Sequence, residues 1–420
     1  MGILPRRGTS VARTWLMLEL IVRCTFVKGT IIIPSYNACE RLYYNLLSLN
    51  FQDYPHDQFE VIVIDNGSAD NTAIMLSEFP ASFRLKTVRV DENKGIAHGR
   101  NQGIIKASGD ILIFHDSDMI AEKSFVRKHI EAHQNDNTVI CGSIWMEIFT
   151  YYYKNFEDFR IPEFNKVKDQ FDFQSEDLDL DVRPVIPREK IIDGSFINYS
   201  FRKDTPFIQS LESVIQEFGL DLNGYHLPWR FFITNNSSVP RSKVVEVGLF
   251  DEKIVNWGFE DYDLGIRLYK SGCHFKLLDI VNVHQAHPRN YARGEALKSF
   301  DYICDKYNEP PHIDIVLACI TTFLRGSLSI DEKDLNYIVE DLYTLQKMGK
   351  YNRLLSYFLA LIQIKKESIL NKLKNQVRKM PIVSMLDSEL ELQLNELVGI
   401  NETVYFVHVL LDLQKEHKGT

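Results

Sequence analysis

The stretch Ile111-Leu-Ile-Phe-His-Asp-Ser-Asp118 is an apolar run that ends in two carboxylates one residue apart. An apolar run followed by polar residues is typical of a buried strand in a parallel sheet. Asp116 and Asp118 would then lie at the carboxyl edge of the sheet, where α/β proteins hold phosphate-bearing ligands and divalent cations. Because Asp-x-Asp also occurs in ordinary solvated loops, this stretch alone leaves both interpretations open.

Residues 29–114 alternate apolar runs with segments of helical spacing. Short apolar runs stopped by proline or polar residues are typical of parallel strands buried on both faces. The predicted strands are Thr30–Ile33, Glu60–Ile64, Leu85–Val90 and Ile111–Phe114, and the predicted helices are 39–51, 72–77 and 97–107. This alternation predicts an α/β fold with a Rossmann-like, mostly parallel sheet flanked by helices. Polar residues that would lie at the carboxyl ends of its strands are Ser35, Asp65, Asn93 and Asp116.

The rest of the chain predicts three parts. We expect a poorly structured extension over residues 1–26 and the α/β domain over residues 27–299. We expect a helical domain over residues 300–420, because apolar residues recur at helical spacing in 335–345, 354–364, 390–397 and 404–413. Residues 145–230 lose the strand and helix rhythm, which indicates an insertion; a substrate loop and a disordered excursion both remain open. Further strands are predicted at Phe231–Ser238 and Val281–His284.

The amino-acid composition argues against a nucleic-acid-binding protein and against a membrane-spanning one. The 420 residues carry a net charge of -9, and no basic stripe interrupts this balance, so we expect no nucleic-acid partner. The six cysteines are widely spaced and indicate a reducing compartment. No stretch is long and apolar enough for a membrane span, and Ile313–Leu324 is predicted to be a buried helix. We therefore expect a cytoplasmic protein, with peripheral association at the inner face of the membrane left open.

Two polar motifs follow predicted strands. Asp65 precedes Asn-Gly67, where a carboxylate can accept hydrogen bonds from a planar imide and glycine allows the tight turn; an ordinary Asx turn is the alternative. The segment Asn93-Lys-Gly-Ile-Ala-His-Gly-Arg-Asn101 opens a helix with Arg100 available for phosphate or a base edge. It lacks the Gly-Lys-Ser/Thr ending of a Walker loop, and a plain polar helix start remains possible.

Two further motifs suggest catalysis and metal binding. In Asn256-Trp-Gly-Phe-Glu-Asp-Tyr-Asp-Leu264, a Trp-Gly corner places Glu260 and Asp261 at a helix start, where one of them can act as a general base or both can simply cap the helix. His284 and His287 follow a predicted strand and could join Asp118 in binding Mn²⁺ or Mg²⁺, although packing or solvation is an equal alternative for such histidines.

Taken in order, these motifs resemble those of family 2 glycosyltransferases with the GT-A fold. The resemblance rests on Pro34-Ser-Tyr-Asn37, Asp65-Asn-Gly-Ser68, Asn93-x-Gly95, Asp116-Ser-Asp118 and Trp257-Gly-Phe-Glu-Asp261 and covers residues 29–295. Residues 231–287 are similar to the galactosyltransferase-type carboxyl half of that fold, as found in polypeptide N-acetylgalactosaminyltransferases and chondroitin-polymerase-like enzymes. Five motifs in one order are far more specific than any one of them.

The resemblance implies an inverting sugar transfer from a nucleotide-sugar donor, usually a UDP-sugar, to a hydroxyl of a glycan or another acceptor. It assigns Asp65 to the uracil, Asp116 to the ribose, Asp118 with His284 or His287 to the metal ion, and Asp261 to the base, while Glu260 would bind acceptor or donor sugar. The residues assigned to the nucleotide sugar are Pro34, Ser35, Tyr36, Asn37, Asp65, Asn93, Gly95, Arg100, Asp116, Ser117, Trp257 and Gly258.

The sequence departs from the family pattern at two points, and these departures limit the activity that we expect. The second motif has Asn66 where aspartate is commonest, which weakens any role for that position. The chain lacks the Gln-x-x-Arg-Trp motif and membrane helices of processive members, so addition of one sugar or a few is expected, in glycan or cell-surface polysaccharide synthesis. A nucleotidyltransferase and a catalytically inactive, carbohydrate-binding GT-A protein are the alternatives. The helical tail is expected to recognise the acceptor, a partner or a second copy of the chain.

Overall fold

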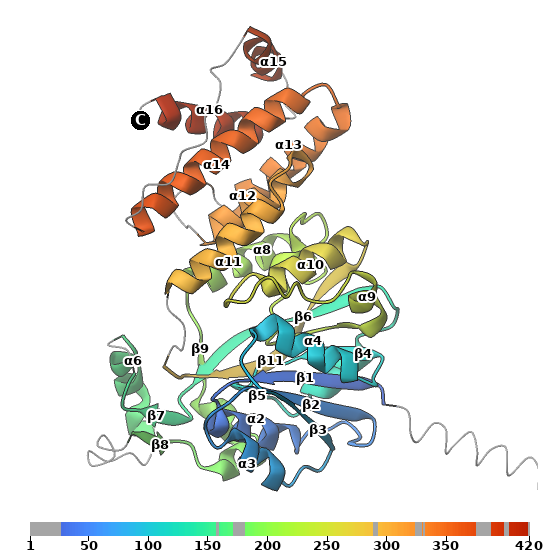
Figure 1. Cartoon of the computed structure of the whole chain (residues 1–420), viewed down its shortest axis with the longest axis vertical. Coiled ribbons are helices and arrows are strands. Elements are labelled where there is room, and N and C mark those ends of the chain that lie inside the picture. Colours follow the sequence, from blue (N-terminus) through green and yellow to red (C-terminus); the bar gives the residue numbers. More distant parts are fainter. Residues whose placement is uncertain are drawn as a thin grey trace, which may run out of the picture. The chain divides into compact units, whose positions relative to one another are not determined.

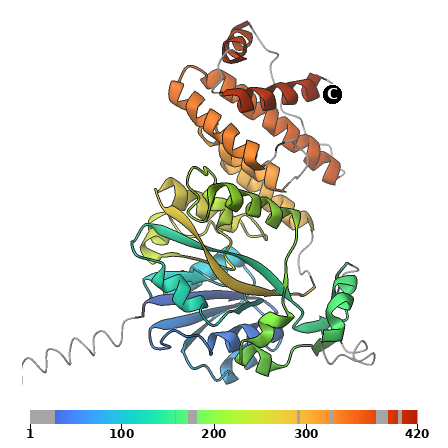
Figure 2. The same ribbon diagram turned by 180° about the vertical axis from the view of Figure 1, so that it is seen from behind.

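A computed structural model describes residues 27–156, 159–170, 181–288, 293–323, 330, 332–374, 388–398 and 403–418 (Figures 1 and 2). The prediction made for residues 1–26 lies outside these residues. The chain divides into two compact units. The first unit comprises Met1–Lys203, Phe232–Glu252 and Arg267–Arg289, and the second comprises Asp204–Phe231, Lys253–Ile266 and Asn290–Thr420.

The first unit is built on a nine-stranded sheet, which confirms the predicted α/β class. Its strand order is β3-β2-β1-β4-β10-β6-β11-β5, with β9 paired to β6. The strands are β1 (Gly29–Ser35), β2 (Phe59–Asn66), β3 (Arg84–Val90), β4 (Ile111–Phe114), β5 (Met119–Ala121), β6 (Thr138–Ile148), β9 (Phe201–Arg202), β10 (Ser237–Pro240) and β11 (His274–Gln285). Strands β3, β2, β1 and β4 run parallel as predicted, whereas β10, β5 and β9 run antiparallel to their neighbours.

Helices cover both faces of this sheet. They are α2 (Cys39–Leu49), α3 (Thr72–Glu78), α4 (Ile96–Lys106), α5 (Phe125–Glu131) and α9 (Arg241–Glu246). Ile31 belongs to the same buried cluster as Leu42 of α2, whereas a side chain at Gly103 of α4 would come within 2.7 Å of Ile32. Because neighbouring strand residues point to opposite faces, α2 and α4 pack on opposite sides of β1. The continuous apolar pattern of β1 reflects this burial on both faces.

The segment predicted to be an irregular insertion folds into short elements around aromatic side chains. It contains β7 (Tyr151–Tyr153), α6 (Arg160–Val167), β8 (Val182–Pro184) and α7 (Arg188–Ile192), with single turns of 3-10 helix at Lys168–Gln170 and Ser195–Tyr199. Tyr151, Phe156 and Phe164 belong to one buried cluster with Tyr44 of α2. Elements of three to eight residues are too short to show a clear period in the sequence, and aromatic packing holds them instead.

All regular elements that the structure describes in the second unit are helices. It contains α8 (Pro206–Phe218), the start of α10 (Glu260–Lys270), α11 (Arg293–Lys306), α12 (Ile313–Phe323), α13 (Glu332–Met348), α14 (Asn352–Lys374), α15 (Ser388–Val398) and α16 (Val404–Lys418), with 3-10 turns at Pro228–Phe231 and Pro310–His312. Residues 204–231 join this unit through Asn336 of α13, which accepts from the His226 N–H and donates to the Gly224 carbonyl. Among the helices that the structure describes, none is long and apolar enough to cross a bilayer.

The strand predicted at Phe231–Ser238 is largely wrong. Phe231 ends a 3-10 turn, and the strand β10 covers only Ser237–Pro240. The Asn236 N–H donates to the Ile233 carbonyl at 3.1 Å, so the intervening residues form a turn. Phe231 and Phe232 are nevertheless buried, which explains why their apolar pattern resembles a strand.

Candidate active site

The loops that follow β1 and β2 are joined to each other at the edge of the sheet. Ser35 at the end of β1 pairs in register with Asp65 at the end of β2. Beyond them, the Asn37 N–H donates to Ser68 Oγ at 2.9 Å, and Asn37 Oδ1 accepts from the Ala69 N–H at 2.8 Å. Asn37 adopts a left-handed backbone with φ of 49°. Pro34 and Ser35 are buried on β1, and the neighbouring Tyr36 is exposed.

Asp65 is a buried carboxylate with partners on both oxygen atoms. Only 3% of the residue is exposed. Its Oδ1 accepts from the Ser68 N–H at 3.0 Å, and its Oδ2 pairs with the guanidinium of Arg89, which also donates to the Ser68 carbonyl at 2.8 Å. The loop after β2 is therefore fixed around the carboxylate that the family resemblance assigns to a nucleotide base.

Asn66, the departure from the commonest form of the motif, has a structural role that aspartate could not fill. Its Nδ2 donates to Asn93 Oδ1 at 2.9 Å and to the Gly95 carbonyl at 3.1 Å. The same Asn93 oxygen accepts from the Gly95 N–H at 2.9 Å, directly before α4 begins. A carboxylate has no hydrogen to donate, so asparagine at this position ties the loop after β2 to the start of α4.

Asp116 is held by Arg100, which the sequence assigns to the same nucleotide-binding group. Arg100 Nη2 donates to Asp116 Oδ1 at 2.8 Å, and the arginine is 1% exposed. The Asp116 carbonyl accepts from Asn45 Nδ2 of α2 at 2.8 Å. The carboxylate therefore lies at the end of β4 in a fixed orientation, while Ser117 leads to Asp118.

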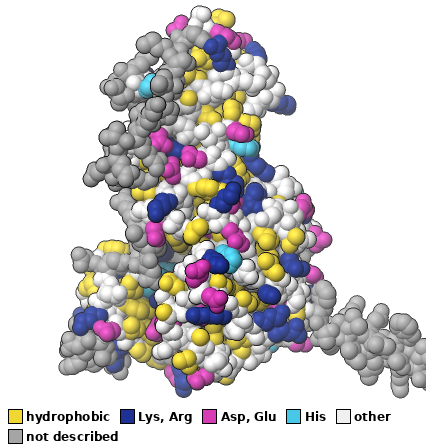
Figure 3. All heavy atoms as spheres, in the orientation of Figure 1, with side chains coloured by type: hydrophobic (Ala, Val, Ile, Leu, Met, Phe, Trp, Pro, Cys, Tyr) yellow, Lys and Arg dark blue, Asp and Glu magenta, His cyan; other side chains and the backbone are white. Residues whose placement is uncertain are grey.

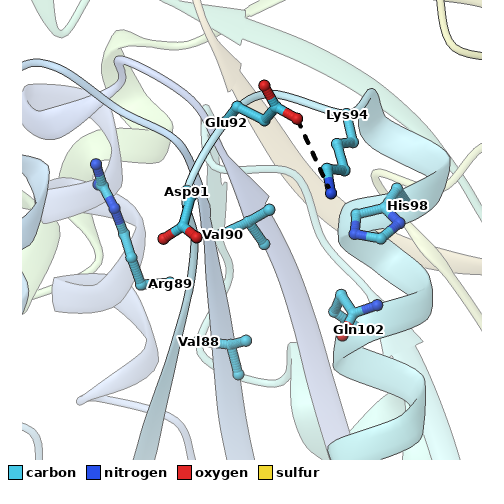
Figure 4. A pocket seen from close by; sticks show the side chains of 8 residues that line it. All are labelled: Val88, Arg89, Val90, Asp91, Glu92, Lys94, His98 and Gln102. Carbon is cyan, nitrogen blue, oxygen red and sulfur yellow. Dashed lines mark ion pairs between the residues drawn. The ribbon is translucent and has the colours of Figure 1, made fainter.

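A charged cavity of about 450 Å³ lies between the end of β3 and α4 (Figure 4). Figure 4 shows Lys94 and His98 on its α4 side, with Glu92 paired to Lys94 and Arg89 directed away from them. Arg89 links this cavity to the Asp65 loop, but neither Asp116 nor Asp118 lines it. On the face seen in Figure 3, acidic and basic side chains are interspersed over the described residues.

Asp118, His284 and His287 come together across two antiparallel strands. Asp118 precedes β5, which pairs with the end of β11, where His284 lies opposite Met119. Asp118 Oδ2 is 3.0 Å from His287 Nε2 and 3.8 Å from His284 Nε2. The ligand atoms of the three residues all lie within 4.8 Å of one another. Ligands at right angles around an ion, each at about 2.1 Å, lie about 3 Å apart. Asp118 Oδ2 and His287 Nε2 have this spacing, and His284 Nε2 lies slightly farther from the carboxylate.

The hydrogen bonds of both histidines direct one nitrogen towards Asp118. His287 Nδ1 lies 2.7 Å from the Pro288 carbonyl oxygen and His284 Nδ1 lies 2.9 Å from Glu147 Oε1; both oxygens accept, so both Nδ1 atoms carry the proton. In a neutral ring, Nε2 then offers a lone pair to a carboxylate oxygen, which is unfavourable unless a proton or a cation lies between them. Burial lowers the pKa of His284 and so favours the neutral ring. These residues therefore fit a divalent cation.

Glu147 supports this cluster, and the sequence analysis did not identify it. This glutamate lies on β6, is 3% exposed and accepts from Arg160 at 2.8 Å and from Lys203 at 3.2 Å, besides its contact with His284. Burial opposes its ionisation, but the bond to His284 and the cations hold the pKa of Glu147 below its usual range. A carboxylate behind a ligating histidine fixes the ring and its tautomer. The one indication of this role in the sequence is that Glu147 interrupts an otherwise apolar stretch of β6.

Glu260 and Asp261 lie in the second unit, at the start of α10. They follow a corner in which Gly258 and Phe259 have φ of 96° and 70°. Glu260 is buried, and Asp261 Oδ1 accepts from the Tyr262 N–H at 2.8 Å. Trp257 at the corner is 49% exposed. The roles of these residues in catalysis stay predictions from the sequence.

Comparisons with known proteins identify the family. Residues 30–181 match the model described as glycosyl transferase family 2, and residues 217–288 match that described as the N-terminal domain of galactosyltransferase. An uncharacterized glycosyltransferase of Bacillus subtilis, YfnE, is 47% identical over 81% of this chain and 84% of its own length.

More distant relatives include validoxylamine A glucosyltransferase of Streptomyces hygroscopicus, 29% identical over 58% of this chain and 51% of that protein. The chondroitin synthase of Escherichia coli is 26% identical over 62% of this chain and 34% of that protein, so the chain spans about half or less of these two relatives. Among solved structures, Staphylococcus aureus TarS (residues 1–349) in complex with UDP-GlcNAc is similar with a TM-score of 0.48 at 16% identity. The similarity covers 85% of this chain and 95% of that one.

The B. subtilis relative is similar across most of both chains, and the family models fall on the segments that carry the predicted motifs. The sheet with helices on both faces is the architecture expected for this family. The chain therefore belongs to glycosyl transferase family 2 and is a glycosyltransferase with the GT-A fold.

Proposed function

We propose that this glycosyltransferase moves a sugar from a nucleotide-sugar donor, a UDP-sugar in the first instance, to an acceptor hydroxyl, with a divalent cation held by Asp118, His284 and His287. The observation that carries the proposal is the convergence of these three side chains beside Asp116. One oxygen and two nitrogen ligands suit Mn²⁺ better than Mg²⁺, because Mg²⁺ prefers oxygen ligands. A bound cation would neutralise the negative charge of the diphosphate.

The remaining roles follow the motif positions. Asp65 and Asp116 bind the base and the ribose, and Asp261 accepts the proton of the acceptor hydroxyl while its oxygen attacks the anomeric carbon. The bond between that carbon and the phosphate oxygen breaks, and the nucleoside diphosphate leaves. Because attack and departure occur on opposite faces in one displacement, the anomeric configuration is inverted.

Relatives support the class of substrate. Their names include a glucosyltransferase and a chondroitin synthase, which favours transfer of a hexose or a related sugar to a hydroxyl of a glycan or a smaller acceptor. The second unit, which differs in architecture from the sheet, is the candidate region for acceptor or partner recognition. Its surface carries exposed apolar side chains on α15 and α16, including Leu392 and Tyr405.

A screen of nucleotide sugars tests the proposal. The purified full chain should release a nucleoside diphosphate from one donor in the presence of Mn²⁺, and should stop when excess chelator is added. Undiminished release in chelator would contradict the role of the metal ion. Absence of turnover with every donor, with and without a panel of sugar acceptors, would favour the catalytically inactive alternative. The product's anomeric configuration, measured by NMR, tests inversion.

A further inference from the structure

Arg41 is a buried cation that the mechanism above does not use. It lies in the first turn of α2 and is 6% exposed. Its guanidinium donates to the hydroxyl of Tyr153 at 3.2 Å and to the carbonyl of Asn37 at 3.4 Å, and both acceptors are neutral. Its Nε atom is buried and has no hydrogen-bond partner among the described residues. The donors of this side chain are therefore only partly satisfied.

Other buried arginines of the first unit differ from Arg41 in having a carboxylate partner. Arg100 pairs with Asp116 and Arg160 pairs with Glu147, each at 2.8 Å. Within the described residues, Arg41 makes no comparable ion pair. Burying a guanidinium without a counter-charge costs several kcal/mol, on the order of the penalty for any unpaired buried ion. A bound anion would supply the ion pair that Arg41 lacks.

Arg41 lies beside the proposed donor site. Gln285 links the two: its side chain donates to the Arg41 carbonyl at 2.9 Å, and its backbone N–H donates to the Asp118 carbonyl at 2.8 Å. The Asn37 carbonyl that accepts from the guanidinium belongs to the loop after β1.

We propose that Arg41 binds the diphosphate of the donor and stabilises the charge that develops on it as the sugar leaves. This inference rests on the proposed function. A guanidinium can bind two phosphate oxygens through two parallel hydrogen bonds, and a water-poor site strengthens that attraction. The diphosphate would form the ion pair that Arg41 lacks among the described residues.

Calorimetric titration of UDP in the presence of Mn²⁺ tests the role of Arg41. Arg41→Gln should weaken UDP binding about 10- to 100-fold, the range expected for a lost hydrogen bond to a charged group. Uridine, which has no phosphate, should bind as it does to the wild type. Mn²⁺ alone, measured by electron paramagnetic resonance, should bind no more weakly, because the substitution removes a positive charge near Asp118. Arg41→Lys should give an intermediate loss, since it keeps the charge without the fork.

Tyr44→Phe is the matched control for the stability of α2. It removes another buried hydrogen bond of the same helix, from the Tyr44 hydroxyl to the Ile186 carbonyl at 2.6 Å, without changing charge. Its UDP affinity should stay within about threefold of the wild type, since a hydrogen bond outside the site contributes to stability and not to binding. If Arg41→Gln fails to fold, Arg41→Lys gives the same test, with its affinity for UDP compared with its affinity for uridine.

The outcomes separate this inference from the function on which it rests. Equal loss of UDP and uridine binding in Arg41→Gln, or no loss of either, would overturn the assignment of Arg41 while leaving the transferase proposal intact. Failure of the wild type to bind UDP, GDP, CDP or ADP with Mn²⁺ would overturn both. A selective loss of diphosphate binding supports both.

Discussion

The two groups of motif residues are held in place by different means. In the first unit, Asp65 lies at the end of β2, and Asp116 and Asp118 follow β4. Each of these carboxylates lies against the side chain of an arginine or a histidine. In the second unit, Glu260 and Asp261 follow a corner where both Gly258 and Phe259 have left-handed backbones. The first group depends on strand pairing and charge, and the second depends on backbone conformation.

The difference indicates where each group is sensitive to change. A left-handed backbone at a bulky residue costs on the order of 1–3 kcal/mol and persists only where packing enforces it. Phe259 is 7% exposed and its ring contacts those of Tyr262, Phe300 and Phe323, so the packing of the second unit compensates this cost. Substitutions at the strand ends should therefore change ligand binding, and substitutions at the corner should change the chemical step.

Asp118→Ala should have the largest effect. Removing the carboxylate leaves two imidazoles and no negative ligand, so Mn²⁺ binding and sugar transfer should both be lost, the latter by about 1,000-fold or more. Calorimetry with Mn²⁺ and a turnover assay measure the two losses. Asp53→Ala, which breaks a surface ion pair with Arg127, is the control and should keep normal turnover. Near-native turnover of Asp118→Ala would remove its assignment as a metal ligand.

Asp261→Asn should abolish transfer while sparing donor binding. The amide is isosteric but cannot accept a proton, and loss of a general base lowers kcat by about 100- to 10,000-fold. The variant should bind UDP with Mn²⁺ as the wild type does, because the residues assigned to the base, the ribose and the metal ion lie in the first unit. Parallel loss of UDP affinity would show that the two groups do not divide binding from chemistry, and unchanged kcat would exclude Asp261 as the base.

Glu147→Gln should have a smaller effect on the metal site. The amide can still contact His284, but it no longer offers a charged partner to Arg160 and Lys203. Loss of such an outer partner of a metal ligand lowers metal affinity by about 10-fold or more. Mn²⁺ titration in the absence of donor measures this directly. Glu163→Gln is the matched control. Glu163 also pairs with Arg160, whereas the contact with His284 is made by Glu147. Equal affinity in both variants would contradict a role for Glu147.

Sequence patterns predicted the strand-end group well because a parallel sheet brings its carboxyl ends to one edge whatever the loops contain. The strands that carry Asp65 and Asp116 were predicted within one or two residues of their observed ends. The same reasoning missed Glu147 and Arg41, since each lies within a regular element and acquires its role only from a neighbour distant in sequence. It also mistook a buried turn near Phe231 for a strand, because burial alone gives both the same apolar pattern.

The smallest expected effect is a change in unfolding free energy on substituting Gly67, in the loop around Asp65. Comparison with Gly194 distinguishes the cost of the backbone conformation from the cost of a steric contact. Gly67 and Gly194 both have positive φ, of 82° and 79°. A side-chain carbon at Gly67 would come within 2.8 Å of the Glu92 backbone, whereas at Gly194 it would meet nothing within 4 Å. Gly194→Ala should therefore cost about 1 kcal/mol of unfolding free energy for the left-handed backbone alone. Gly67→Ala should cost about 2–3 kcal/mol, because the loop must also shift. It should weaken UDP binding too, since Asp65 and Asn66 lie directly before Gly67. Denaturant unfolding of both variants gives the two free energies, and equal losses would show that the contact with Glu92 relaxes without cost.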